Sequence, residues 1–269
     1  LKYKIVLIGS GNLATSLGVK LFESAQQVVQ VYSKTLENAK GLAKKLHCNY
    51  TNSLNEIDTS ADIYIIGIKD DKIHEVSIAL KQFLKPDKII AHTSGVNSPN
   101  LIDDYFINRS LFYPLQSFSK IKTLLWDEIP IFLEGSTYAT KLLTEVAHGL
   151  SNQVLEMNDQ IRTHLHLASV FANNFSNFNL LIAERILAKS KVPFTVIQSL
   201  MKETIDKAFA LGSKSAQTGP AKRGDNLTIE KHIRLLVTEF PEYRSLYKKY
   251  SQIIQKEFKH ENPGTDSTS

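Results

Sequence analysis

The chain has 269 residues, 42% hydrophobic and 22% charged, which is enough for one large or two medium globular domains and excludes wholesale disorder. Its single cysteine, Cys48, excludes an intrachain disulfide and cysteine-rich zinc or iron–sulfur sites, and we expect no metal. The net charge of +5 suits an anionic ligand but does not by itself indicate nucleic acid, so no nucleic-acid partner is expected.

Short apolar runs alternate with helical patterns in the first part of the chain. Strands are expected at residues 4–8, 28–32, 61–68, 88–92, 110–113, 130–133 and 153–157. Helices are expected at residues 12–24, 35–46, 71–83 and 137–150. Strands that alternate with helices need crossover connections, so the pattern predicts an α/β fold with a doubly wound parallel sheet.

The chain changes character after residue 157. No strand pattern recurs, and helices are expected at residues 160–189, 193–211, 227–240 and 241–258. The polar segment 259–269 contains Pro and Gly and is expected to be a disordered tail. The sequence therefore predicts a sheet domain at 1–157, an all-α domain at 158–258 and a tail at 259–269.

The longest stretch without Asp, Glu, Lys or Arg is residues 163–183, which is long enough to be a membrane candidate. Its two histidines, two serines and four asparagines would be costly in hydrocarbon. A helix buried between protein surfaces is the better interpretation. Residues 1–9 have no signal-peptide pattern, and we expect a cytoplasmic protein with no membrane partner.

The turn between the first expected strand and helix carries the pattern GxGxxA. Gly9 permits a tight turn, Gly11 lets a pyrophosphate approach the backbone, and Ala14 allows close helix–strand packing. The amides and positive dipole end of the new helix would bind the phosphates. A purely structural turn is the alternative, but the strand before it and the amphipathic helix after it favour a nucleotide. The predicted cofactor-binding residues here are Gly9, Ser10, Gly11, Asn12, Leu13 and Ala14.

The residues after the second expected strand bear on which dinucleotide binds. An NAD-preferring site places Asp or Glu there to bind the ribose 2′-hydroxyl. This chain has Ser33 and Lys34 instead, and the nearest carboxylate, Glu37, lies beyond the turn. A hydroxyl and an ammonium suit a 2′-phosphate, so the sequence favours NADP over NAD and over a methyltransferase cofactor. A solvated loop lysine is the alternative for Lys34.

A third turn, at the end of the 61–68 strand, falls at the same edge of the sheet. Open α/β sheets bind ligands outside the carboxyl ends of their strands. Gly67 and Ile68 are therefore predicted to contact the cofactor. Asp71 either takes part in the site or only caps the next helix, and the sequence leaves both open.

Two more turns follow the 88–92 and 110–113 strands. We expect Ser94 to act in catalysis by orienting the substrate or nicotinamide, and Thr93 and Gly95 to bind substrate. Ser and Gly are also favoured in ordinary turns. For Gln116 and Ser117 the two interpretations remain equal.

Two features of the helical part carry polar side chains. His166, Ser169, Asn173 and Asn177 follow at spacings of three and four residues, which places them on one face of an expected helix. The stripe either faces a ligand cleft or bonds to neighbouring helices. We favour the cleft for His166 and Asn173 as catalytic residues, but not for Asn177.

The second feature is the loop 218–225, TGPAKRGD, where two glycines and a proline fix an irregular connection. Lys222 and Arg223 are predicted to bind an anionic substrate. In the alternative interpretation, Asp225 caps the next helix and pairs locally with Arg223.

The segments GSGNLA, HTSG, YPLQSF, HLASVFANNF and TGPAKRGD together cover most of the chain. In this order they resemble a group of NADP oxidoreductases with a Rossmann-like domain and a helical carboxyl-terminal domain of unassigned function. That group is similar to pyrroline-5-carboxylate reductase, to deazaflavin-dependent NADP oxidoreductase and, more distantly, to the 6-phosphogluconate dehydrogenase superfamily. The resemblance implies a helical domain that forms a dimer, with Ser33 and Lys34 near the 2′-phosphate of NADP. The rest of the cofactor would be bound at Gly9, Gly11, Asn12, Leu13 and Ala14.

One departure from the superfamily concerns its β-hydroxyacid dehydrogenases, which carry a catalytic lysine one helical turn before an asparagine. Here the corresponding positions are Val170 and Ser169, before Asn174 and Asn173. The general acid is therefore unassigned, and His166 is the nearest replacement.

These observations predict an NADP(H)-dependent oxidoreductase for a small, carboxylated carbonyl or imine substrate bound in an interdomain cleft. A ketopantoate or pyrroline-5-carboxylate type reductase is the more specific alternative. A non-catalytic NADP-binding sensor is the other.

Overall fold

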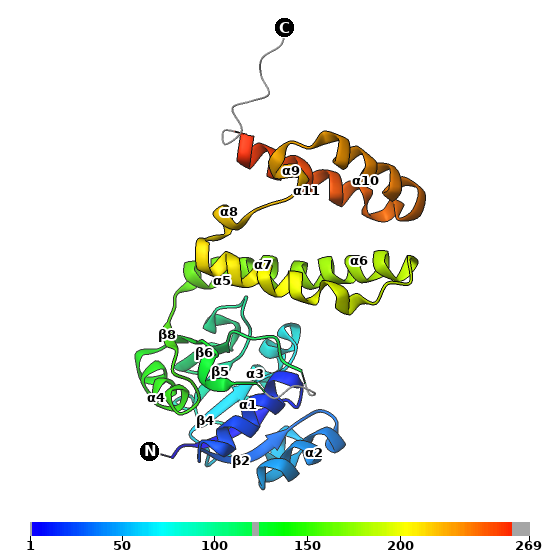
Figure 1. Ribbon diagram of the computed structural model, residues 1–269. Helices are drawn as coiled ribbons and strands as arrows, with labels where there is room; N and C mark the ends of the chain where they lie inside the picture. The colour runs from blue at the N-terminus through cyan, green and yellow to red at the C-terminus, as the bar shows by residue number, and fades with distance from the viewer. Residues whose placement is uncertain (1, 120–123, 260–269) are drawn as a thin grey trace. The chain divides into compact units, whose positions relative to one another are not determined.

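The structure, a computed structural model, describes residues 2–119 and 124–259 (Figure 1). The chain divides into two compact units, Leu1–Ser169 and Val170–Ser269. The division falls later than the predicted boundary at residue 157, because helix α5 (Asp159–Ser169) belongs to the sheet unit. Its Arg162 is 2% exposed and bonds to the Val96 carbonyl and the Glu134 carboxylate of that unit. The predicted tail lies outside the described residues apart from Lys259.

The first unit is built on one eight-stranded sheet of order β3-β2-β1-β4-β5-β6-β7-β8. The strands are β1 (Lys4–Ile8), β2 (Gln27–Tyr32), β3 (Asn49–Thr51), β4 (Ile63–Ile66), β5 (Ile89–His92), β6 (Asn108–Pro114), β7 (Ile131–Gly135) and β8 (Val154–Glu156). The reversal of order around β1 and β4 is that of a doubly wound sheet. The predicted α/β fold class with a Rossmann-type sheet is therefore confirmed.

Two details of the sheet differ from the prediction. The short edge strand β3 was not expected, since its three residues make too short a run to show alternation. Strands β6 and β7 pair antiparallel, so the sheet is not wholly parallel. A parallel crossover usually needs a helix. In the described part of the β6–β7 connection the helical element is one 3₁₀ turn, η4 (Trp126–Glu128).

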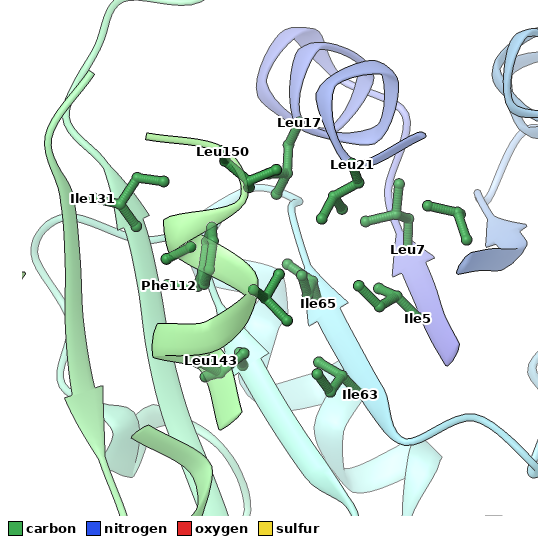
Figure 2. Close-up of a cluster of buried hydrophobic side chains, with 14 of the residues drawn as sticks. Ile5, Leu7, Leu17, Leu21, Ile63, Ile65, Phe112, Ile131, Leu143 and Leu150 are labelled. Carbon is green, nitrogen blue, oxygen red and sulfur yellow. The ribbon is translucent and has the colours of Figure 1, made fainter. Parts of the chain in front are cut away.

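Helices cover both faces of the sheet (Figure 1). They are α1 (Asn12–Glu23), α2 (Leu36–Leu46), α3 (Ile73–Leu80) and α4 (Thr137–His148). Alternate residues of β1 point to opposite sides, so Ile5 and Leu7 join the cluster under α1, α2 and α4, drawn in Figure 2. Val6 and Ile8 join a second cluster that includes Ile73 of α3. Strands buried on both faces explain the continuous apolar runs of the sequence.

The second unit is helical, as predicted. Its α-helices are α6 (Ser176–Lys189), α7 (Gln198–Leu211), α8 (Ser213–Ala216), α9 (Pro220–Arg223), α10 (Asn226–Glu239) and α11 (Arg244–Phe258). The helix predicted over 160–189 is interrupted by a π-helix at Val170–Phe175. Each π turn takes in an extra residue, which rotates the residues after it around the axis. Asn177 therefore does not continue the stripe of His166 and Ser169 in the way the spacing predicts.

The helix expected to be buried around residues 163–183 is open in the single chain. Neither the π-helix nor α6 contains a buried residue, and Phe171 and Phe178 are 62% and 45% exposed. The prediction of burial is therefore wrong for one copy of the chain. Of the helices in the described residues, none combines the length and apolar character that a membrane span needs.

Candidate functional site

The glycine turn after β1 is held close to the end of β4. Gly9 has φ +123°, a left-handed conformation that favours glycine, and a Cβ built on it would lie 2.3 Å from the Gly67 carbonyl oxygen. A Cβ on Gly67 would lie 3.2 Å from that of Ala14, which is 2% exposed on α1. Small residues are therefore required at all three positions. Helix α1 starts after Gly11 with no side-chain cap and no acidic residue in its first turn, so its amides are open to an anion.

A pocket of about 770 Å³ opens at this turn along the carboxyl edge of the sheet. It gathers ten of the residues that the sequence assigned to cofactor or substrate, namely Gly9, Ser10, Gly11, Asn12, Leu13, Ser33, Lys34, Gly67, Ile68 and Thr93. Ala14 is buried and does not line the pocket. The predicted turns after β1, β2, β4 and β5 therefore meet in one place.

A further wall of the pocket, which the sequence did not predict, comes from Tyr32, Leu54 and the segment formed by the 3₁₀ turn η2 (Asp70–Lys72), the residue before it and α3. The missed residues of that segment are Lys69, Asp70, Lys72, Glu75, Val76 and Ala79. Lys72, Glu75, Val76 and Ala79 follow at helical spacing, so they share one face of α3 and the turn before it. That periodicity, starting at the carboxyl end of β4, is the signal that could have identified them.

Lysines give one side of the pocket a positive character. Lys34, Lys69 and Lys72 line it, against the carboxylates of Asp70 and Glu75. Lys72 Nζ lies 2.9 Å from Glu75 Oε2, and this hydrogen bond, with a smaller contribution from Lys34, lowers the pKa of Glu75. The Ser10 and Ser33 hydroxyls lie 2.8 Å apart, which joins the glycine turn to the turn after β2.

Ser94, in the loop after β5, is fully engaged within the protein. Its hydroxyl donates to Asp70 Oδ2 over 2.7 Å and accepts from the Asn97 side-chain amide over 2.9 Å. It also accepts from the backbone amides of Val96 and Asn97. Ser94 is 4% exposed. Its hydroxyl hydrogen is therefore committed to Asp70, and the network fixes the loop beside the pocket.

His92, the last residue of β5, supports the same loop. Its Nδ1 accepts from the Ser94 amide over 3.2 Å, and its Nε2 lies 3.0 Å from the Ser98 carbonyl oxygen. The two contacts require a neutral ring with its proton on Nε2. Burial lowers the pKa of His92, which favours that neutral form.

His166 lies one turn after the buried Arg162 on α5. The Nδ1 atom of His166 is buried, and no residue of the described chain hydrogen-bonds to it. A buried polar atom without a partner is unusual and costly. His164, by contrast, is exposed and its Nδ1 lies 2.8 Å from the Gln160 carbonyl oxygen. The unsatisfied atom distinguishes His166 as a ligand-binding candidate.

Of the remaining predicted residues, Gly95 follows Ser94 in the loop after β5 of the sheet unit, and the others belong to the second unit; none of them lines the pocket. Asn173 lies in the π-helix. Lys222 Nζ stands 4.7 Å from the centroid of the Phe258 ring, and Arg223 is exposed at the end of α9. Asp225 caps α10 by accepting from the Thr228 amide over 3.0 Å, as the structural interpretation of that loop predicts.

Two smaller predictions concern turn residues and metals. The Ser117 amide donates to Gln116 Oε1 over 2.8 Å, which is ordinary turn geometry. In the part of the chain that the structure describes, no group of three or more His, Cys, Asp or Glu side chains could hold a metal ion.

Two family models match separate parts of the chain. Residues 4–95 match the family described as "NADP oxidoreductase coenzyme F420-dependent". Residues 129–254 match a family described as "Domain of unknown function (DUF2520)". No curated protein matches.

Solved structures resemble the chain over nearly its full length. A Bacteroides fragilis protein described as a "putative NADP oxidoreductase" is 38% identical, with a TM-score of 0.89, over 95% of this chain and 98% of its own. An imine reductase from Myxococcus stipitatus in complex with NADP+ is 14% identical, with a TM-score of 0.67, over 96% and 93% of the two chains. A pyrroline-5-carboxylate reductase from Coxiella burnetii is also 14% identical, with a TM-score of 0.58, over 97% and 98%. At 14% identity the two reductases show the fold alone.

The Bacteroides protein carries the assignment, because its identity to this chain is high and spans both units. The predicted oxidoreductase class and the predicted cofactor, NADP, are confirmed at the level of the family. The chain belongs to the family of NADP oxidoreductases that the Bacteroides fragilis protein represents.

Proposed function

We propose that this oxidoreductase reduces a small, carboxylated carbonyl or imine with NADPH. The observation that carries the proposal is the single pocket in which the GxGxxA turn, the Ser33–Lys34 pair and the end of β4 meet. The pocket fits the cofactor, because a Cβ built on Gly11 would have no neighbouring atom within 4 Å, so a phosphate can approach the backbone there, and open amides lie at the start of α1.

The residues of the pocket divide by the part of NADP that they would hold. The amides of the 9–14 turn would bind the pyrophosphate, and Ser33 and Lys34 the 2′-phosphate. Gly67 and Ile68 would contact the cofactor farther along the edge. When bound, the cofactor supplies the hydride.

The substrate residues form the second part of the proposal. Thr93 and Gly95 would lie against the substrate or nicotinamide, and Lys222 and Arg223 would bind the substrate carboxylate. His166 would supply a proton to the reduced heteroatom, and Asn173 would orient the substrate. Ser94 would act by holding Asp70 and the loop in place, because its hydroxyl hydrogen is engaged.

Two alternative functions each agree with one observation. Reduction of pyrroline-5-carboxylate or ketopantoate agrees with the fold shared with pyrroline-5-carboxylate reductase. A non-catalytic NADP sensor agrees with the absence of a lysine one turn before Asn173 or Asn174.

We also propose that the chain forms a homodimer through its helical unit. Large apolar side chains of the π-helix, α6 and α7 are exposed in one copy, namely Phe171, Phe175, Phe178, Leu181, Leu200, Ile205, Phe209 and Leu211. Exposed apolar surface of this extent indicates an interface. A second copy is the simplest occupant, because closed twofold dimers are the commonest soluble assemblies.

The function is tested by NADPH oxidation with a panel of keto acids, imino acids, cyclic imines and aldehydes. We expect turnover with at least one carboxylated carbonyl or imine, and tighter binding of NADP+ than of NAD+ by calorimetry. Binding of NADP+ without turnover across the panel would favour the sensor. Failure to bind either dinucleotide would contradict the cofactor site itself.

His166→Ala tests the proposed proton donor. It should lower kcat on the order of 100-fold while the Kd for NADP+ is retained. His164→Ala is the matched control, because it removes an exposed imidazole two residues away on the same helix. An unchanged kcat for His166→Ala would remove His166 from the mechanism.

A further inference from the structure

Tyr113 is a phenol at the carboxyl edge of the sheet that the proposed mechanism does not use. It is the penultimate residue of β6 and is half-buried. On the neighbouring strand β5, His92 pairs with Leu111, so Tyr113 lies beside the loop that continues from His92 through Thr93 to Gly95. Thr93 lines the NADP pocket. The phenol therefore stands next to the pocket at the end farthest from the residues predicted for the 2′-phosphate.

The tip of the Tyr113 ring packs directly on Gly95. A Cβ built on Gly95 would lie 2.5 Å from Tyr113 Cζ and 2.7 Å from its hydroxyl oxygen. Gly95 has an ordinary backbone conformation, since its φ is not positive, so backbone strain does not require glycine there. Glycine is required there because the phenol occupies the space that a Cβ would need. Glycine at position 95 is thus what allows the hydroxyl to reach this place.

Among the described residues, the Tyr113 hydroxyl makes no hydrogen bond. The nearby Asp70 carboxylate, which lines the pocket, accepts hydrogen bonds at Oδ2 from the Ser94 hydroxyl and the Asn97 side-chain amide, over 2.7 and 3.3 Å. Burial and the charge of Asp70 raise the pKa of Tyr113. The phenol therefore keeps its hydrogen across the physiological range and can donate it in a hydrogen bond.

We propose that the Tyr113 hydroxyl donates a hydrogen bond to the heteroatom of the substrate's C=O or C=N bond. The inference rests on the proposed function, because it needs a hydride acceptor bound beside Thr93. When the carbon accepts hydride, negative charge develops on the heteroatom, and a fixed donor in a partly dehydrated site stabilises that charge. The phenol keeps its own proton, and the proton added to the product comes from His166 or water. Tyr113 thus acts as an electrophilic group and not as an acid.

The first test is Tyr113→Phe, which keeps the ring over Gly95 and removes the hydroxyl. With the carbonyl or imine that the wild-type protein reduces best in the panel, kcat should fall on the order of 100-fold. The Kd for NADP+ should change less than about twofold, since the pyrophosphate and 2′-phosphate contacts are untouched. Tyr138→Phe is the matched control, because Tyr138 is 57% exposed at the start of α4 and belongs to no proposed site.

The second test uses Gly95→Ala, whose methyl group would displace the phenol. Alone it should lower kcat about as much as Tyr113→Phe does, and the double variant should lose little more. Losses that multiply would mean that Gly95 acts independently of the hydroxyl.

The third measurement does not depend on turnover. The absorbance of phenolate near 295 nm, taken as the difference between wild type and Tyr113→Phe, reports the ionisation of Tyr113 alone. Its midpoint should lie above that of free tyrosine, and Asp70→Asn should lower it, because asparagine keeps an acceptor for Ser94 and removes the charge.

The outcomes of these tests distinguish a failure of the inference from a failure of the proposed function on which it rests. Turnover by the wild type with an unchanged kcat in Tyr113→Phe overturns the inference alone. A loss of NADP+ affinity as large as the loss of kcat also overturns it, since the phenol would then serve the cofactor. No turnover with any probe in the panel removes the proposed function and the inference together.

Discussion

The two units differ in how much of their apolar surface each one buries. The sheet unit buries both faces of its strands. Figure 2 shows one of its two apolar clusters, in which side chains of β1, β4, β6, β7, α1 and α4 pack against one another. In the helical unit the buried hydrophobic residues of the described chain are Ala221, Ile229, Leu236, Tyr243 and Phe258. All five lie in the segment from α9 to α11. Helices α6 and α7 bury none.

The difference indicates that the two units obtain their stability in different ways. A sheet closed on both sides by its own helices needs no other chain. Phe209 of α7, however, is 90% exposed, and Leu200 is 64% exposed. Side chains of this size in a helix that buries nothing are explained if another surface covers them. The comparison therefore predicts that equivalent truncations will behave differently in the two units.

Phe112→Ala should have the largest effect on stability. Phe112 of β6 is fully buried in the sheet unit, and removing a buried phenyl group leaves a cavity as well as losing transfer free energy. We expect the free energy of unfolding of this unit to fall by about 3–5 kcal/mol. Denaturant unfolding followed by far-UV circular dichroism measures it. The loss should not depend on protein concentration, and a loss below about 1 kcal/mol would contradict the packed core.

Phe209→Ala removes the same phenyl group from the helical unit. If one copy of the chain were complete, a truncation at a 90% exposed site would change stability by less than about 0.5 kcal/mol. In the proposed dimer it should weaken association by about 2 kcal/mol, as for a buried aromatic anchor. Sedimentation equilibrium over a range of concentrations gives the dimer Kd. A wild-type protein that stays monomeric at every concentration would remove the dimer and this explanation of the exposed face.

The same contrast limits what the sequence could predict. Strand β1 was predicted at its observed bounds, and the residues of the GxGxxA turn other than Ala14 line one pocket, because both features depend on local chemistry. An apolar run bounded by glycine, and glycines where a backbone must pass close by, can be recognised within a few residues. The antiparallel pairing of β6 and β7 could not be predicted in this way, because strand direction is set by the connection and not by the alternation of side chains.

The helical unit shows the opposite case. Helices α6, α7, α10 and α11 were predicted, whereas the short α8 was not, and α9 lies in the segment 218–225 that was predicted as a loop. The predicted burial of residues 163–183 was wrong for the single chain, since an apolar face does not reveal which surface covers it. The π-helix at Val170–Phe175 could not be predicted from the spacing of the apolar residues, because an extra residue in a helical turn leaves the residue types unchanged. The roles of Asn173, Lys222 and Arg223 stay predictions for the same reason. The role of His166 is also a prediction, but its buried Nδ1 atom, which has no hydrogen-bond partner among the described residues, favours it.

Lys34→Gln should have a smaller effect, confined to the cofactor. Lys34 lines the pocket and is exposed, so its attraction for a 2′-phosphate is screened by water and salt. We expect NADP+ to bind roughly fivefold more weakly, about 1 kcal/mol, with NAD+ affinity unchanged. Isothermal titration calorimetry with both dinucleotides measures the two values. Equal losses for NADP+ and NAD+ would show that Lys34 does not recognise the extra phosphate.

The Kd for NADP+ also distinguishes the two units. The lining of the pocket comes from residues of the sheet unit alone. Phe209→Ala should therefore leave the Kd for NADP+ unchanged even where it shifts the protein toward monomers. A parallel loss of cofactor affinity would mean that the helical unit contributes to the cofactor site.

The smallest effect expected is a pH dependence of the sheet unit's stability that comes from His92. Burial lowers the pKa of His92 in the folded protein, whereas in the unfolded chain it should titrate near its ordinary value of about 6.5. Between these two pKa values the unfolded chain binds more protons, so stability decreases as pH falls below about 6.5 and levels off below the folded-state value. Protonation of Nδ1 would also break the bond from the Ser94 amide. Unfolding midpoints at pH 7.5, 6.5 and 5.5 should fall in that order, and His92→Asn should flatten the trend while His148→Asn, at an exposed position in the last turn of α4, should not. An identical slope in His92→Asn and wild type would assign the pH dependence to other groups.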